Sequence, residues 1–179
     1  MHIPISHTNY EDLIENALWI VVDAWAKQPN NDDADMNLNI YNSIFLGHLK
    51  EELMKTHVYK EDKIVQLKCK KVINFMQSEE GQIDSRFVEF EHINNQEDLF
   101  KYIIENSITD IVICGLHYGK CITTTATILL DAIKIHNEGQ EPILPGRNLF
   151  IKRDMCLLWP NDEISMHDRV YKQMDLDLI

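Results

Sequence analysis

The sequence lacks several features that would assign it to other classes of protein. No apolar run is long enough to cross a membrane, and the first residues show neither a basic start nor an apolar stretch, so no secretory signal is expected. Basic residues are scarce, because 17 lysines and arginines stand against 29 aspartates and glutamates and give a net charge of −12. This balance argues against a nucleic-acid partner and against an anionic membrane surface.

Cysteine is sparse as well, and repeats and low-complexity tracts are missing. The four cysteines are scattered, without the spacing of a disulfide framework or of a CxxC pair, which predicts a reducing, cytoplasmic location. The acidic segment 24–35 lacks the spacing and the glycine of a calcium loop, so a solvated loop is expected there and no metal or cofactor. A chain of 179 residues suffices for a single domain spanning 1–179.

The order of apolar patterns predicts an α/β protein. Strands are expected at 17–22, 72–76, 86–92, 111–114 and 148–159, and helices at 36–57, 95–106, 121–132 and 168–174. Segment 58–71 fits either a strand or the end of a helix. Strands that alternate with helices favour a mostly parallel sheet covered on both faces, which is a three-layer, single-domain fold.

The helix at 36–57 carries an apolar stripe that is predicted to face the core. The stripe consists of Leu38, Tyr41, Ile44, Phe45, Leu49 and Leu53.

The segment 111–132 concentrates the features that bear on chemistry. An apolar strand ends at Gly115, a short turn follows, and Cys121 opens the next helix. Free N–H groups and the helix dipole stabilise a thiolate at such a position, and Lys120 adds a cation. The same N–H groups suit an oxyanion. The alternative is that Cys121 is a small buried residue of the core.

Asp23 follows the first strand directly. Sites in open α/β sheets lie beyond the carboxyl ends of the strands, so this carboxylate is well placed for chemistry. A turn or helix-capping role is equally compatible with its position.

Two stretches resemble the isochorismatase-like cysteine hydrolases, a family that includes the nicotinamidases. They are Val21-Val22-Asp23 and the block 111–132, with its Gly115-to-Cys121 spacing and Thr-rich helix. The resemblance implies that Cys121 attacks an amide carbonyl and forms a thioester, while Asp23 acts as general base and acid. It also implies an oxyanion hole made by the backbone N–H groups of His117 and Cys121, and a cis peptide at Leu116–His117.

The sequence departs from the family at the end of the third strand. The family has a lysine there, whereas this chain offers Glu89, Glu91 and His92. An anion in place of the cation raises the pKa of Cys121, although His92 or Lys120 can substitute in part.

The residues predicted to line the substrate pocket are Trp25, Glu91, His92 and Tyr118. For Trp25, stacking on a planar substrate and a core or lid role both remain open, and His92 also fits a surface position. Nicotinamidases have a metal site after the first strand. We expect none here, because the loop 24–35 has no histidine.

Two functions follow from these observations. The first is a cysteine hydrolase of a small amide or related carbonyl compound, working with an atypical site. The second is a catalytically inactive relative that binds a ligand or a protein. In either case we expect a small-molecule ligand or substrate and a homo-oligomer such as a dimer.

Overall fold

The computed structural model describes residues 17–25, 36–54, 57–60, 63–66, 71–76, 82–134 and 141–179. Its elements, in chain order, are β1 (Leu18–Val22), α2 (Met36–Leu53), β2 (His57–Lys60), β3 (Lys63–Gln66), β4 (Lys71–Phe75), β5 (Glu91–Ile93), α3 (Gln96–Glu105), β6 (Asp110–Tyr118), α4 (Cys121–Ile133), β7 (Asn148–Leu158), α5 (Ile164–Gln173) and β8 (Asp177–Leu178).

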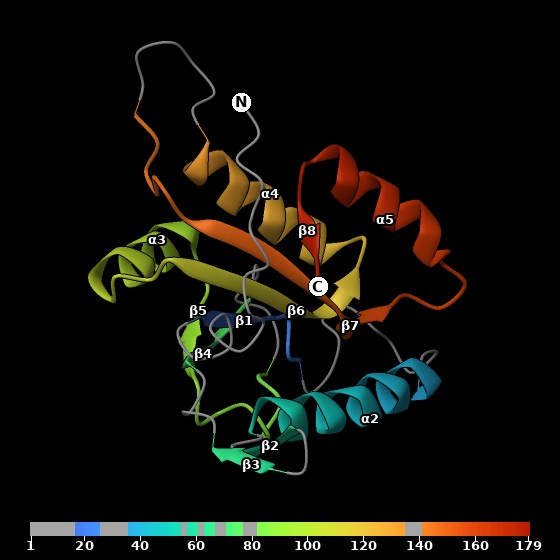
Figure 1. The fold of residues 1–179 in the computed structure, drawn as a ribbon. Coiled ribbons are helices and arrows are strands. Elements are labelled where there is room, and N and C mark those ends of the chain that lie inside the picture. Colours follow the sequence, from blue (N-terminus) through green and yellow to red (C-terminus); the bar gives the residue numbers. More distant parts are fainter. Residues whose placement is uncertain are drawn as a thin grey trace.

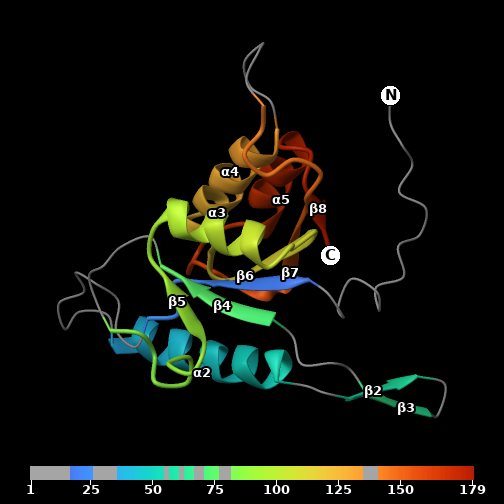
Figure 2. The same cartoon turned by 90° about the vertical axis from the view of Figure 1, so that its left-hand side faces the viewer.

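A six-stranded sheet in the order β5-β4-β1-β6-β7-β8 forms the middle layer, and all its neighbouring strands run parallel. Helices α3, α4 and α5 cover one face and α2 covers the other, as the two perpendicular views show (Figures 1 and 2). The predicted α/β fold with a parallel sheet between helical layers is therefore confirmed. In the described ranges, no helix is long and apolar enough to cross a membrane.

The centre of the sheet explains why β1 reads as an unbroken apolar run. All five of its residues are buried, and their side chains alternate between two cores. Leu18, Ile20 and Val22 pack on the side of α3, α4 and α5, whereas Trp19 and Val21 pack on the side of α2. A strand that is buried on both faces has no position for a polar side chain.

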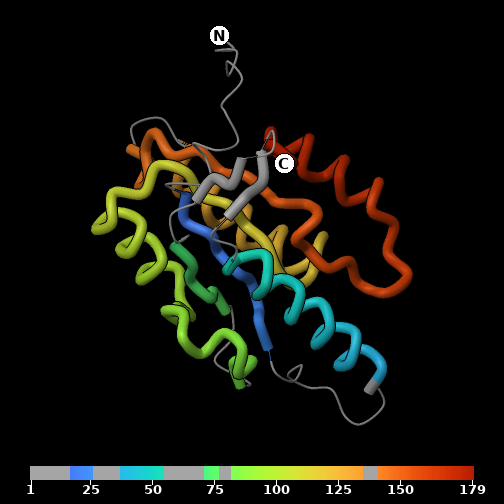
Figure 3. Tube along the Cα trace, turned by 60° about the horizontal axis from the view of Figure 1, so that its bottom comes forward, coloured from blue at the N-terminus to red at the C-terminus, as the bar shows by residue number. Residues whose placement is uncertain are grey.

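The strand order reverses direction between β1 and β6. Counted along the chain, the strands of the sheet lie in the order 3-2-1-4-5-6, so successive strands go to one side from β1 and then to the other. In Figure 3, β1 lies centrally and α2 runs across the near face of the sheet. Ligands of open α/β sheets bind in the crevice at such a reversal, beyond the carboxyl ends of the strands.

The predicted strand at 86–92 is wrong. Turns occupy 85–89, and the strand β5 is confined to Glu91–Ile93. The carboxylate of Asp84 accepts hydrogen bonds from the backbone N–H and the guanidinium of Arg86, which also reaches the Ser43 carbonyl on α2. These contacts hold the chain in a turn, while Phe87 is buried as a strand pattern would also require.

The stripe predicted for α2 is wrong in part. Tyr41 and Ile44 are 48% and 59% exposed, although Leu38, Leu49 and Leu53 are buried as expected. The buried face also includes Asn42, a polar residue with a specific partner described below. The helix ends at Leu53, and the strands of segment 58–71 form an antiparallel β2–β3 hairpin.

The prediction that the strand ends at Gly115 is wrong, because β6 continues to Tyr118. The glycine has φ +115°, and a Cβ atom there would lie 2.5 Å from the carbonyl oxygen of Val22. It therefore lets β6 approach the end of β1 closely. At the other end of the chain, α5 begins at Ile164 and not near Asp168, and β8 was not predicted.

Candidate active site

Asp23 and Cys121 meet where the strand order reverses. Val22, the last residue of β1, pairs with Gly115 of β6, and β6 runs three residues further before the turn to α4. Asp23 is fixed by a 3.0 Å hydrogen bond from its N–H to the Phe75 carbonyl of β4. Its φ of +51° lies in the left-handed region, which few residues other than glycine adopt.

Cys121 is the first residue of α4, as predicted, and its side chain is partly buried. The thiol is hydrogen-bonded to the Asp23 carboxylate, and the backbone N–H groups of His117 and Cys121 also act on the sulfur. Burial and the Asp23 charge raise the pKa of the thiol to about 12, because the two N–H groups offset only part of their effect. The resting pair is therefore a thiol beside a carboxylate acceptor.

Lys120, the cation predicted beside the thiol, packs on Trp159. Its ammonium lies 3.7 Å from the ring centroid of Trp159, over the indole face. Stabilisation of a Cys121 thiolate by Lys120 therefore stays a prediction.

His117 ties the turn before Cys121 to α2. The peptide bond Leu116–His117 is cis, as the resemblance implied. The imidazole is buried, with Nε2 3.1 Å from Asn42 Oδ1, and its ring meets Trp159 edge-on at 4.7 Å. Burial and the charge of Lys120 lower the pKa of His117 to about 4, so the ring is neutral and Nε2 donates to the amide oxygen.

Helix α5 holds the same turn from the other face of the sheet. The hydroxyl of the fully buried Tyr171 accepts a 3.0 Å hydrogen bond from the Gly119 N–H and lies 2.9 Å from the Thr123 hydroxyl. These contacts fall two residues before and two residues after Cys121. Gly119 has φ +81°, and a Cβ atom there would lie 2.1 Å from Nδ1 of His167, so α5 packs directly on the turn.

Tyr118 belongs to this helical contact and not to the space around Asp23. Its hydroxyl donates to Asp168 at 2.7 Å, and its ring lies 4.9 Å from that of Tyr171. Burial and the Asp168 hydrogen bond raise the pKa of Tyr118 far above its usual value. The structure thus places this predicted pocket residue in the core between β6 and α5.

Glu91 and His92 are not brought to Cys121. They lie exposed on β5, at the edge of the sheet, with β4 and β1 between them and β6. Glu91 pairs with Ile73, two residues before the end of β4, so it lies inside the sheet and not at its carboxyl end. Its charge acts on Tyr102 of α3 instead. The register therefore keeps both side chains on the edge strand, away from Cys121.

Trp25 lies two residues beyond Asp23. It forms an isolated antiparallel bridge with Ile83, and its side chain is buried. This position is close in sequence to the proposed base, but its role in binding stays a prediction. Within the described ranges, no group of three or more His, Cys, Asp and Glu side chains is arranged to hold a metal ion.

Sequence reasoning missed Asn42, Tyr171 and Trp159. Each contacts the turn 117–121 or one of its side chains from an element distant in sequence. For Asn42 a signal was present, since it lies four residues after Leu38 and four before Leu46 on one helical face. For the other two no local pattern indicated a role.

Comparisons with known proteins agree with the architecture. No family model matches the chain, and no curated protein matches its sequence. The fold is similar to the crystal structure of an isochorismatase-like hydrolase from Alkaliphilus metalliredigens, with a TM-score of 0.52 over 92% of this chain and 94% of that chain. The two chains are 13% identical, so the likeness shows a shared fold.

Proposed function

We propose that this chain is a cysteine-dependent hydrolase of a small amide or related carbonyl compound, akin to the nicotinamidase-related enzymes. One observation carries the proposal: the Cys121 thiol is hydrogen-bonded to the Asp23 carboxylate, with the N–H groups of His117 and Cys121 at the sulfur. A nucleophile, a base within hydrogen-bond reach and backbone donors are what acyl transfer needs.

The acylation step uses the raised pKa of the thiol. As the sulfur attacks the carbonyl carbon, its proton passes to the Asp23 carboxylate, so a free thiolate need not accumulate. The N–H groups of His117 and Cys121 stabilise the negative oxygen of the tetrahedral intermediate. The protonated Asp23 then gives its proton to the leaving nitrogen, the C–N bond breaks, and a thioester to Cys121 remains.

Deacylation reverses these roles. Asp23 takes a proton from water, and the hydroxide oxygen attacks the thioester carbonyl carbon. When the C–S bond breaks, the sulfur recovers the proton from Asp23 and the carboxylic acid leaves. Each proton that moves is thus accounted for by Asp23 and Cys121, with the neutral imidazole of His117 holding the turn in place.

A second candidate function is a catalytically inactive member that binds a ligand or a protein. It is favoured by the high thiol pKa and by the exposed position of Glu91 and His92, which leaves no replacement for the lysine among those residues. We further propose that the chain works in the cytoplasm as a homo-oligomer. A small-molecule substrate or ligand is the expected partner.

A screen of primary amides for ammonia release tests the hydrolase. The proposal expects turnover by the unmodified protein, an acyl adduct on Cys121 in mass spectra of quenched reactions, and loss of both in Cys121→Ala. Cys156→Ala, which removes a cysteine of β7, is the matched control and should keep turnover. A folded protein that releases no ammonia and forms no adduct would support the inactive relative instead.

A further inference from the structure

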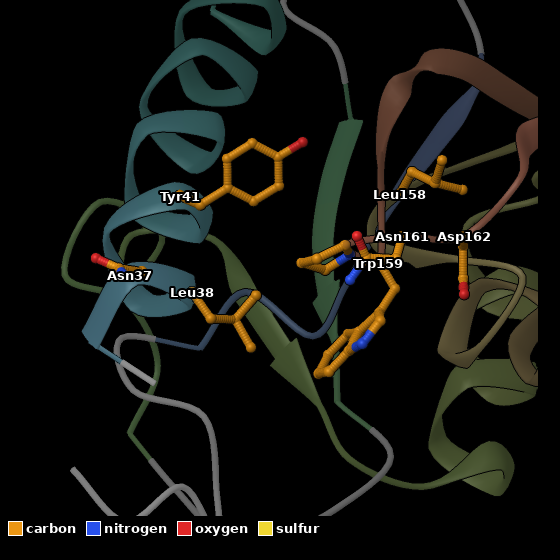
Figure 4. A pocket seen from close by; sticks show the side chains of 8 residues that line it. Asn37, Leu38, Tyr41, Leu158, Trp159, Asn161 and Asp162 are labelled. Carbon is orange, nitrogen blue, oxygen red and sulfur yellow. The ribbon is translucent and has the colours of Figure 1, made fainter. Parts of the chain in front are cut away.

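A cavity of about 510 Å³ lies beside the turn that carries Cys121. One wall is the start of α2, with Leu38 and Tyr41, and the other is the end of β7 and the residues after it, with Leu158 and Trp159. Figure 4 shows Leu38 and Tyr41 directed from α2 toward the side of Trp159. The cavity has the size and the apolar, aromatic lining of small-molecule sites.

The position of this cavity connects it to the proposed active site. Leu158 pairs with Tyr118 at the carboxyl end of β6, beyond which the turn to Cys121 begins. The Trp159 ring contacts the His117 imidazole at 4.7 Å, and the backbone N–H of His117 acts on the Cys121 sulfur. A group bound against Trp159 would therefore contact the neighbour of His117, whose backbone N–H belongs to the predicted oxyanion hole.

The charges around the cavity point to an uncharged occupant. Asp162 is the lining carboxylate, and its Oδ2 lies 3.2 Å from Nε2 of His167. The ammonium of Lys120, of opposite sign, lies over the Trp159 ring. The remaining polar side-chain groups of the lining are neutral: the amides of Asn37 and Asn161 and the hydroxyl of Tyr41. A ligand with a full charge would meet one favourable and one unfavourable neighbour here.

We propose that this cavity binds the non-reacting part of the substrate and that this part is an uncharged aromatic ring system, larger than one ring. A cavity of about 150 Å³ already holds benzene, so the available volume accommodates a bicyclic group. Tyr41 and the part of the Trp159 side chain that lines the cavity are available for aromatic contact. This inference rests on the proposed function, because it assigns the substrate class of the same site.

The test measures binding and turnover separately, with 2-naphthamide as the probe and acetamide as its small counterpart. Binding is measured by calorimetry on the Cys121→Ala protein, which cannot turn the probe over. We expect 2-naphthamide to bind and acetamide not to bind detectably. Trp159→Ala in that background should weaken binding at least about tenfold, and Tyr41→Ala about threefold, through lost aromatic contact.

Two controls keep the result interpretable. Ile44→Ala removes another exposed apolar side chain of α2 outside the cavity and should leave binding within about twofold, since it lines no part of the site. Tyr41 is half exposed, so Tyr41→Ala is expected to fold even if Trp159→Ala does not. Equal binding in Tyr41→Ala and Ile44→Ala, or no binding of 2-naphthamide, would overturn the assignment of the cavity.

Ammonia release from both amides by the unmodified protein separates this inference from the proposed function. Turnover that prefers 2-naphthamide over acetamide in kcat/KM supports the inference. Turnover of both amides without that preference overturns the substrate class and leaves the hydrolase intact. Binding of 2-naphthamide without release from any amide contradicts the proposed chemistry while the cavity assignment stands.

Discussion

The β6–α4 connection and the edge strand β5 lie on opposite sides of β1, and they differ in how many contacts link them to the proposed active site. On the β6–α4 side, segment 117–121 is held by Asn42 from α2, by Tyr171 from α5 and by Asp23, which directly follows β1. On the β5 side, Glu91 and His92 are exposed and lie away from Cys121. The proposed nucleophile is thus supported from three parts of the chain, whereas the predicted side chains of β5 lie away from it.

In the proposed mechanism, Cys121 and Asp23 therefore carry out the chemistry without a lysine. A family lysine at the third strand would stabilise negative charge near the sulfur, but here the neighbouring carboxylate raises the thiol pKa. In the proposed mechanism, the proton therefore stays on the Cys121 sulfur at rest and passes to Asp23 during the attack.

The largest expected effect is the loss of turnover in Cys121→Ala, compared with substitutions on β5. Cys121→Ala should lower kcat for any amide substrate at least about 10⁴-fold, because removal of a nucleophile leaves only binding and oxyanion contacts. Glu91→Gln and His92→Gln should each stay within about threefold, since exposed side chains away from the sulfur touch no reacting atom. A comparable loss in His92→Gln would show that β5 does take part.

The second prediction concerns stability in acid. The pKa of His117 in the folded protein is about 4 against the usual 6.5, so the unfolded chain takes up a proton first as the pH falls. The stabilisation from a neutral, buried His117 is complete above pH 6.5 and is lost between pH 6.5 and pH 4, by up to about 3 kcal/mol.

Urea unfolding at pH 7 and pH 4.5 measures this loss. The unmodified protein should lose more free energy of unfolding between these pH values than His117→Gln does. The same substitution at the exposed His92 gives the baseline. Equal losses in the unmodified protein and in His117→Gln would mean that His117 is not the residue responsible.

A smaller effect is expected from Tyr171→Phe. The substitution keeps the ring but leaves the Gly119 N–H and the Thr123 hydroxyl without their partner, so the turn around Cys121 loosens. We expect kcat to fall about tenfold with little change in KM, and the free energy of unfolding to fall by about 1–2 kcal/mol. Tyr102→Phe, on the β5 side, is the matched control, and an equal fall in its kcat would refute a specific role for Tyr171.

The sequence was sufficient to predict the elements that depend on short local patterns. The buried strand β1, the strand–turn–helix around Cys121 and the parallel sheet all follow from short apolar patterns and their order. The pairing of Asp23 with Cys121 could be expected as well, because the carboxyl ends of parallel strands share one edge of the sheet.

The errors arise where distant contacts override local patterns. The alternation in 86–92 suits a strand, but the Asp84–Arg86 pair and the Ser43 carbonyl hold turns there. Tyr171 contacts Gly119 across 52 residues of sequence, and no periodic pattern predicts that contact. The contact of the Lys120 ammonium with Trp159 likewise joins residues far apart in the sequence, and no local pattern indicated it.

The most direct test of the central claim is the rate at which iodoacetamide labels Cys121 in Asp23→Asn, measured by mass spectrometry across pH. Only the thiolate reacts, so removing the Asp23 charge should lower the thiol pKa and speed labelling at pH 8 by about tenfold for each pKa unit removed. Asp177→Asn, on the exposed end of β8, is the control.

We expect opposite changes in one variant: faster labelling of Cys121 in Asp23→Asn, together with loss of amide hydrolysis. Labelling that stays the same or slows in Asp23→Asn would contradict this expectation, because the carboxylate would then not be holding the proton on the Cys121 sulfur.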